Sequence, residues 1–281
     1  MKYRSKKGFT LAELLIVVAI IAVLVELPFT GKLIWLAEKI VPVLPEENQQ
    51  MEDRSLVYMT QLTKVPAPVA LRQTQREITR MGHIAADNLQ RALDCFFHYN
   101  SAKAASVRSH EESVNILNHL IADAMVDLRS LDLSPENMRR VSMMTIAVTD
   151  IERLSDHAEN IVEYIEQMNT KKAEMSDAAR KELIDMSKDA MDAVYMALDI
   201  FEKDDYNKLD QIEILEQHVD DHEKDLINNH IERIMNSLCN PLSAVIFSDL
   251  VTDLERCSDH AINLAYALKE RPSEMDAPKI I

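Results

Sequence analysis

Apolar residues recur at alternating intervals of three and four along most of the chain between residues 72 and 270. This spacing places them on one side of an α-helix and predicts helices that pack side by side. Two helix starts are marked by Ser134-Pro135 and Asn240-Pro241, because Ser or Asn caps a helix whose first residue is often proline. Turn residues and polar breaks divide the pattern into six helices, expected near residues 72–98, 106–132, 135–168, 177–203, 207–239 and 241–270.

The six helices form two equivalent triplets. The third helix of each triplet carries DIERLSDHAEN (150–160) or DLERCSDHAIN (253–263), which are identical at eight of eleven positions. Short connections make neighbouring helices antiparallel. The predicted fold class is therefore all-α, with two tandem three-helix bundles packed on each other. The matched apolar lines are Met81, Ala85, Leu89, Ala92 and Phe96 with Met186, Ala190, Val194, Ala197 and Phe201; Val114, Leu117, Ile121, Ala124, Leu128 and Leu131 with Ile227, Ile231, Ile234 and Leu238; and Met144, Ala147, Ile151, Leu154, Ala158, Ile161, Ile165 and Met168 with Phe247, Leu250, Leu254, Cys257, Ala261, Leu264 and Leu268.

The amino-terminal part has a different pattern. Four cations lie among the first seven residues, an apolar run extends from Phe9 to Val25, and a second apolar stretch follows up to Leu44. A bilayer core needs about 20 helical residues, and Leu14 to Leu36 is long enough to cross it. The predicted domains are thus a leader with a membrane-spanning helix (1–44), a polar, proline-interrupted linker (45–70), the first bundle (71–168), and the second bundle with a tail (169–281).

Composition excludes several classes of function. The net charge of −16 argues against a nucleic-acid binder that neutralises phosphates. Only three glycines occur in 281 residues, which disfavours Gly-rich phosphate loops and Rossmann folds. The three cysteines have neither zinc-site spacing nor the even number of a disulfide framework. No Ser/His/Asp or Cys/His constellation stands out, so we expect a protein that is not an enzyme.

Acidic residues follow the outer side of the third helix in each triplet. Glu152 and Asp156 are one turn apart, and Glu255 and Asp259 repeat this spacing. Like charges at this spacing repel, and a cation would reverse that cost. The candidate metals are Fe, Zn, Mn and Mg, since carboxylates suit hard or borderline ions. A solvated acidic face with no ligand remains the alternative.

Four further residues of the repeated motif are candidate metal ligands, because they flank the same acidic stripe in the helical projection. Imidazole nitrogens could complete a coordination sphere that the carboxylates begin. Arg153 and Arg256 also lie inside the motif and could neutralise part of its negative charge. The four flanking candidates are Asp150, Asp253, His157 and His260.

The run KGFTLAELL near the amino terminus resembles the signal of type IV prepilins. In that family a glycine precedes the cleavage point, phenylalanine becomes the new amino terminus and a glutamate follows five residues in; these positions fall on Gly8, Phe9 and Glu13. The resemblance implies cleavage between Gly8 and Phe9 and methylation of Phe9. The remainder departs from pilins, because it has neither a strand-rich head nor a carboxy-terminal cysteine loop.

The repeated DIERLSDHAENI and DLERCSDHAINL resemble the E/D-xxx-D signature of the PhoU-like family, regulators of phosphate uptake built as two three-helix bundles. The resemblance extends over residues 70–270. It implies metal clusters on the carboxylates of Glu152, Asp156, Glu255 and Asp259.

Two segments, ELPFTGKLIWLAEKIVP (26–42) and KVPAPVALRQTQREITRMG (64–82), resemble bacterial sodium/phosphate cotransporters, in which a PhoU-like domain follows the last membrane helix. A single span cannot enclose a substrate site between repeats at the bilayer midplane. We therefore expect a membrane-anchored regulatory module of phosphate uptake that does not itself transport. The alternative is a pilin-like structural subunit.

The membrane topology has two opposing indications. The cations at residues 1–7 predict a cytoplasmic amino terminus, which would place the bundles outside the cytoplasm. The cotransporter resemblance implies cytoplasmic bundles, and we favour this arrangement in the bacterial inner membrane. The acidic bundles would suit a transporter or sensor-kinase partner with a basic surface. A homo-oligomer is also compatible with the sequence, whereas a nucleic-acid partner is not expected.

Overall fold

The computed structural model describes residues 53–59 and 61–269, and these residues contain six long α-helices and no strand. The first three helices are α4 (Ala67–Phe97), α5 (Ser101–Arg129) and α6 (Pro135–Lys171). The second three are α7 (Asp177–Lys203), α8 (Leu209–Met235) and α9 (Pro241–Tyr266). Short 3-10 turns at Leu62–Lys64 and Tyr206–Lys208 precede α4 and α8. The all-α prediction is confirmed for this part of the chain.

Local side-chain chemistry sets where several helices begin. Asn100 Oδ1 accepts hydrogen bonds from the backbone nitrogens of the first turn of α5, and Ser176 Oγ does the same for α7. Ser134 and Asn240 cap α6 and α9 in the same way, and each is followed by proline at the first helical position. A capping oxygen pairs with amide hydrogens that have no partner within the helix. The two helix starts predicted from Ser-Pro and Asn-Pro are confirmed.

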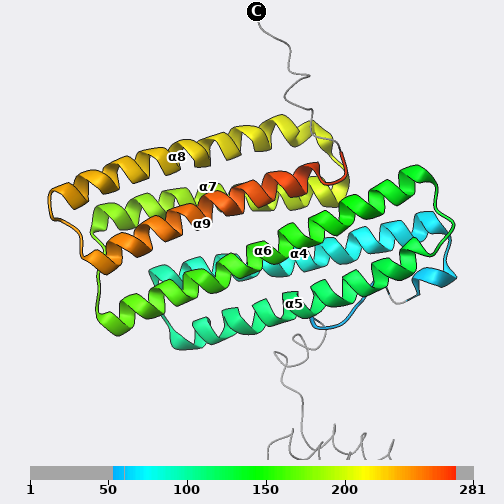
Figure 1. The fold of residues 1–281 in the computed structure, drawn as a ribbon, viewed down its shortest axis with the longest axis horizontal. Coiled ribbons are helices and arrows are strands. Elements are labelled where there is room, and N and C mark those ends of the chain that lie inside the picture. The colour runs from blue at the N-terminus through cyan, green and yellow to red at the C-terminus, as the bar shows by residue number, and fades with distance from the viewer. Residues whose placement is uncertain (1–52, 60, 270–281) are drawn as a thin grey trace, which may run out of the picture. The chain divides into compact units, whose positions relative to one another are not determined.

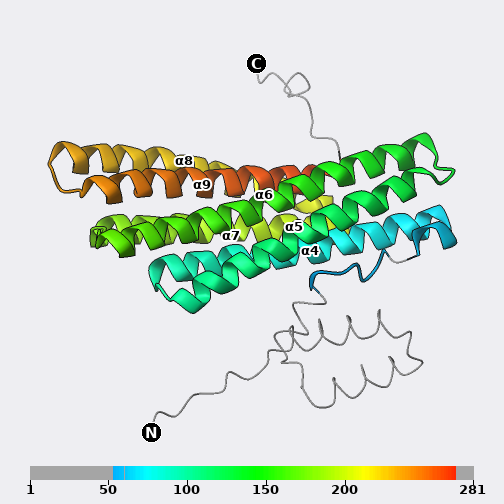
Figure 2. The same cartoon turned by 60° about the horizontal axis from the view of Figure 1, so that its bottom comes forward.

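The helices form two antiparallel triplets. Helices α4, α5 and α6 pack against one another, as do α7, α8 and α9. The triplets join where α6 lies along α9 and α4 lies along α7. Figure 1 shows the triplet α7–α9 above the triplet α4–α6, and Figure 2 shows the same six helices after rotation, with α6 beside α9. Leucine, isoleucine, methionine and alanine side chains of both triplets form one continuous buried cluster.

Helix α8 differs from the prediction. It ends at Met235, and the left-handed conformation of Ser237 (φ 55°) turns the chain toward α9. Ile231 is 48% exposed and Ile234 is 49% exposed, although the sequence pattern placed both in a buried line. Helix α8 carries two lines of apolar residues, and packing against α7 and α9 buries the line that does not contain Ile231 and Ile234. The buried line consists of Leu209, Ile212, Val219, Leu226 and His230.

The predicted linker (45–70) is only partly correct. Its described residues contact the first triplet, and Met59, Leu62 and Ala70 are buried in the core. The backbone nitrogens of Val57 and Tyr58 donate to Glu77 Oε2 over 2.8 and 2.5 Å. We call residues 53–59 the strap. Sequence reasoning missed it because its bonds use backbone amides and one distant carboxylate, which leave no periodic pattern.

The predicted leader and membrane-spanning helix (1–44) lie outside the described residues. Among residues 53–59 and 61–269, no helix is long and apolar enough to cross a membrane. The predicted boundary between the bundles at 168/169 falls within α6, which continues to Lys171.

Candidate functional site

The repeated motif has two faces, and the structure gives each a different environment. On α6, Asp150 and His157 point into the interface between the triplets, whereas Glu152 is half-buried and Asp156 is exposed on the outer side. The second copy on α9 repeats this division. The motif therefore supplies one buried polar layer and one acidic stripe rather than a single cluster.

The buried layer consists of two reciprocal histidine–aspartate pairs. His157 Nδ1 lies 3.0 Å from Asp253 Oδ1, and His260 Nδ1 lies 2.9 Å from Asp150 Oδ1. The two imidazole centroids are 5.7 Å apart. Each pair connects α6 with α9, so each bundle supplies one imidazole and one carboxylate to the contact. The expectation that these four residues flank the acidic stripe is wrong, because their polar atoms join the two bundles.

The two pairs are not equivalent. The Tyr164 hydroxyl donates to Asp253 Oδ2 over 2.8 Å, so both oxygens of this carboxylate have partners. Burial and the hydrogen bond to Asp253 raise the pKa of Tyr164. In the second repeat Ala267 stands where Tyr164 stands in the first, and the buried Asp150 Oδ2 has no hydrogen-bond partner among the described residues. The two halves of the interface therefore differ: both oxygens of Asp253 have hydrogen-bond partners, whereas only one oxygen of Asp150 has one.

The acidic stripe on the outer side extends onto a neighbouring helix in each triplet. Burial and the charge of Asp156 raise the pKa of Glu152, and burial also raises the pKa of Asp156. On α5, burial and the charges of Glu159, Asp156 and Glu112 raise the pKa of Glu111 to about 7. Sequence reasoning missed Glu111, because nothing in the α6 motif indicates which residue of α5 lies opposite.

The second stripe repeats this electrostatic pattern. Burial raises the pKa of Glu255 to about 7, with further contributions from the charges of Asp259, Glu223 and Asp220. Glu223 and Asp220 belong to α8, so this stripe is also completed by the middle helix of its triplet. In each repeat, neighbouring carboxylates add to burial in disfavouring ionisation of one glutamate, Glu111 in the first repeat and Glu255 in the second.

The atoms that both stripes offer as metal ligands are carboxylate oxygens, which suit hard cations such as Mg²⁺ and Mn²⁺. One oxygen of Glu111 accepts from the Asn115 amide, and Arg108 lies 3.8 Å from Glu159 while it also pairs with Glu166. Within the described part of the chain, no group of three or more His, Cys, Asp or Glu is arranged to hold a metal ion. The residue types fit a cation, but the structure gives no coordination geometry for one.

The raised pKa of Glu255 makes stability depend on pH. The group titrates near 7 in the folded chain and near 4.5 when unperturbed, so the folded state binds more protons between these values. We expect the urea midpoint to fall as pH rises from 5 to 8. Glu255→Gln should weaken this dependence and raise the midpoint at pH 8, because the neutral amide has no charge to desolvate.

Glu232→Gln is the matched control, since it removes an exposed carboxylate from the neighbouring helix α8. Its urea midpoints should follow the parent curve across the same pH range. If Glu255→Gln also follows that curve, burial and repulsion do not act on Glu255 as described.

Comparison with known families gives two matches. The sequence pattern of the family described as "PhoU domain" matches residues 78–165 and 183–268, and each match covers most of one helix triplet. The pattern described as "Prokaryotic N-terminal methylation motif" matches residues 3–25. The predicted processing residues Gly8, Phe9 and Glu13 fall in that match and lie outside the described residues.

Individual relatives and solved structures agree with the first match. The chain is 24% identical over 189 residues to a phosphate-specific transport system accessory protein PhoU homolog from Xylella fastidiosa, covering 67% of this chain and 79% of the relative. A PhoU homolog 1 from Thermotoga maritima is 23% identical over 67% of this chain and 81% of its own length.

Two crystal structures share the fold. PhoU from Pseudomonas aeruginosa aligns with a TM-score of 0.66 at 20% identity, over 70% of this chain and 94% of that structure. The phosphate transport system regulatory protein PhoU from Streptococcus pneumoniae aligns with a TM-score of 0.65 at 17% identity, over 72% and 95%. The expectation of a PhoU-like six-helix arrangement is thereby confirmed.

Proposed function

Because this chain belongs to the PhoU domain family, we propose that it is a regulatory or accessory protein of phosphate uptake, attached to the inner membrane by its amino-terminal segment. The observation that carries the proposal is the coincidence of the two family matches with the two helix triplets. The relatives' names refer to phosphate-specific transport systems. The PhoU-like part makes up most of the chain, so regulation is favoured over a structural role.

The test is genetic. Deletion of the gene that encodes this chain should alter uptake of radioactive phosphate or the response of phosphate-starvation genes. Expression of the intact chain should restore whichever of the two was altered. The gene response is measured as well as the uptake, because a regulator can act on the transporter or on gene expression. Unchanged uptake and unchanged gene response after deletion would exclude the proposed role.

The carboxylate stripes are proposed to bind metal ions, drawn from Fe, Zn, Mn and Mg. Support comes from the resemblance of the motif and from the mutual repulsion that a cation would relieve. We expect full-length chain purified without chelator to contain metal, and Glu152→Gln with Asp156→Asn to lose about half of it, because one of the two stripes is removed. Elemental analysis by mass spectrometry measures the content.

A control for the metal experiment is Asp185→Asn with Asp189→Asn, which removes an acidic pair at the same one-turn spacing on α7. This variant should retain the metal of the parent chain. Equal loss in both variants, or a metal-free parent, would show that the stripes are solvated surfaces.

The bundles are proposed to face the cytoplasm, as the cotransporter resemblance implies. Cys239 offers a test, because it is half-buried at the α8–α9 turn while Cys95 and Cys257 are buried. In intact spheroplasts, a membrane-impermeant maleimide should leave Cys239 unlabelled until the membrane is permeabilised. Cys239→Ser is the control for labelling elsewhere, and labelling of intact spheroplasts would place the bundles outside.

The second candidate function is a pilin-like structural subunit, favoured by the methylation-motif match at residues 3–25. Incubation with a prepilin peptidase should then remove the residues up to Gly8, and Gly8→Leu should block the cut. An uncut parent chain would eliminate this candidate, whereas a cut chain that still regulates phosphate uptake would show an anchored regulator with a processed leader.

A further inference from the structure

A pocket of about 310 Å³ is lined by the strap, one face of α4 and the last turn of α7, and by no residue of either acidic stripe. Its charged lining consists of three arginines and one carboxylate, with a histidine beside them. This excess of cations is unusual in a chain whose net charge is −16. We call it the arginine pocket; its lining includes Tyr58, Arg72, Arg76, Arg80, His83 and Glu202.

The three arginines occupy successive turns of one helix face. Arg72, Arg76 and Arg80 are four residues apart on α4, so their guanidinium groups are neighbours and repel one another. Arg80 is held by Glu77, with Nη2 2.6 Å from Oε1. Glu77 itself is fully buried beneath the strap, where it accepts hydrogen bonds from two backbone amides of the strap. It therefore orients Arg80 without lining the pocket.

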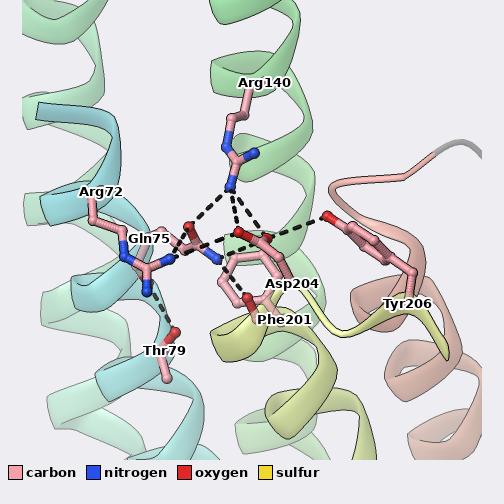
Figure 3. Close-up of polar contacts among 7 residues, drawn as sticks. All are labelled: Arg72, Gln75, Thr79, Arg140, Phe201, Asp204 and Tyr206. Carbon is pink, nitrogen blue, oxygen red and sulfur yellow. Dashed lines mark hydrogen bonds and ion pairs between the residues drawn. The ribbon is translucent and has the colours of Figure 1, made fainter. Parts of the chain in front are cut away.

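Arg72 keeps donors that face solvent. Its Nη1 donates to Gln75 Oε1 over 3.3 Å and lies 3.7 Å from Asp204 Oδ2, while 59% of its side chain remains exposed. Asp204 is shared, because Arg140 Nη2 lies 3.3 Å from both of its oxygens. Figure 3 shows Arg72 and Arg140 converging on Gln75 and Asp204 from two different helices. The network fixes the position of Arg72 and leaves its charge only partly balanced.

Of the three arginines, Arg76 has the positive charge that is least balanced by neighbouring carboxylates. Its guanidinium carbon lies 4.3 Å from the centroid of the Tyr58 ring, which orients the group. Among the described residues, no carboxylate lies within ion-pair distance of Arg76. Glu202, the single carboxylate of the lining, lies 3.7 Å from His83 at the other side of the pocket. A fixed, exposed guanidinium without a counter-charge is suited to an anion from solution.

We propose that the arginine pocket binds a small anion carrying a phosphoryl group, either inorganic phosphate or a phosphate ester. Guanidinium groups match phosphoryl oxygens with paired N–H donors, which a compact ammonium group cannot do. Arg72 and Arg76 supply these donors, and Arg80 adds positive potential at the rim. The volume exceeds that of one phosphate and falls in the usual range for organic ligands, which leaves room for an esterified group.

This inference is independent of the proposed regulatory function, because the strap, α4 and the end of α7 form the pocket whatever the chain regulates. It also differs from the acidic stripes, which would attract cations. Ligand in the pocket would contact the Tyr58 side and the α4 side together, so binding should hold the strap against the bundle.

The test is calorimetric titration of the full-length chain in detergent at constant ionic strength, with sodium phosphate in one arm and ATP without divalent metal in the other. Saturable binding is expected in at least one arm, and the stronger arm identifies the source of the phosphoryl group. Arg76→Gln should weaken that binding at least tenfold. Arg76→Lys should recover only part of it, since lysine keeps the charge but lacks the planar fork.

Arg91→Gln is the matched control, because Arg91 is an exposed arginine on the same helix outside the pocket. It should bind like the parent chain, and circular dichroism should show all variants equally helical. Amide hydrogen exchange supplies a second readout: ligand should slow exchange of residues 53–59 in the parent and not in Arg76→Gln. Absence of binding in both arms, or equal weakening by Arg91→Gln, would overturn the proposal.

Discussion

Asp253→Ala is expected to lower the free energy of unfolding by about 3 kcal/mol, because it removes the shared acceptor of one buried and one partly buried donor. His157 Nδ1 and the Tyr164 hydroxyl both contact this carboxylate. Leaving a buried polar group without a partner costs roughly 1–3 kcal/mol. Urea unfolding of the full-length chain in detergent, followed by circular dichroism, measures the change.

Asp150→Ala is the matched variant in the other half of the interface. Asp150 accepts from His260 through one oxygen, and its second oxygen has no partner in the described structure. We therefore expect about half the loss seen for Asp253→Ala, since only one donor is orphaned. Tyr164→Phe should reduce the difference between the two aspartate sites. Equal losses of unfolding free energy at Asp150 and Asp253 would show that the different number of hydrogen-bond partners at the two carboxylates does not affect stability.

Gly82→Val should also destabilise the fold, by about 2–3 kcal/mol, because α4 approaches α7 and α6 closely at this glycine. A Cβ atom at residue 82 would overlap Leu198 Cδ2 and lie 3.4 Å from Ile151 Cδ1. The same change in an open helix position would cost little. Thermal or urea unfolding of the variant measures the effect.

A double-mutant cycle tests whether Leu198 is the cause. Leu198→Ala alone leaves a cavity and costs about 2–5 kcal/mol. Combined with Gly82→Val, the loss should be at least about 1 kcal/mol smaller than the sum, as expected for residues in contact. Ala105→Val, at an exposed position of α5, should cost less than about 1 kcal/mol, since only the lower helix propensity of valine acts there. Simple additivity would show that the clash lies elsewhere.

Much of the helical architecture could be predicted from local signals. The apolar residues of α4, α6, α7 and α9 lie in the core as their spacing indicates, and the Ser-Pro and Asn-Pro starts are where the sequence places them. Such signals act within one helix, so neighbouring residues suffice to specify them. Helix α8 shows the limit: it carries two apolar lines, and only its neighbours decide which one is buried.

The candidate site was predictable to a smaller extent. The paired acids Glu152–Asp156 and Glu255–Asp259 share the outer face, as their one-turn spacing requires. Their partners on α5 and α8, such as Glu111, carry no sequence signal. The helical projection puts His157 and His260 beside the acidic stripe, whereas both lie in the α6–α9 interface, because a projection gives the angle of a side chain but not what faces it.

The duplication of a helical triplet within residues 67–266 follows from local patterns alone, because repeated spacing and repeated caps are properties of neighbouring residues. Which polar residues meet follows from the packing of the helices: His157 contacts Asp253, Glu111 lies near the acidic stripe, and the strap binds Glu77. These contacts join residues 19 to 96 positions apart. Their pairing depends on how the helices pack, which no local pattern encodes.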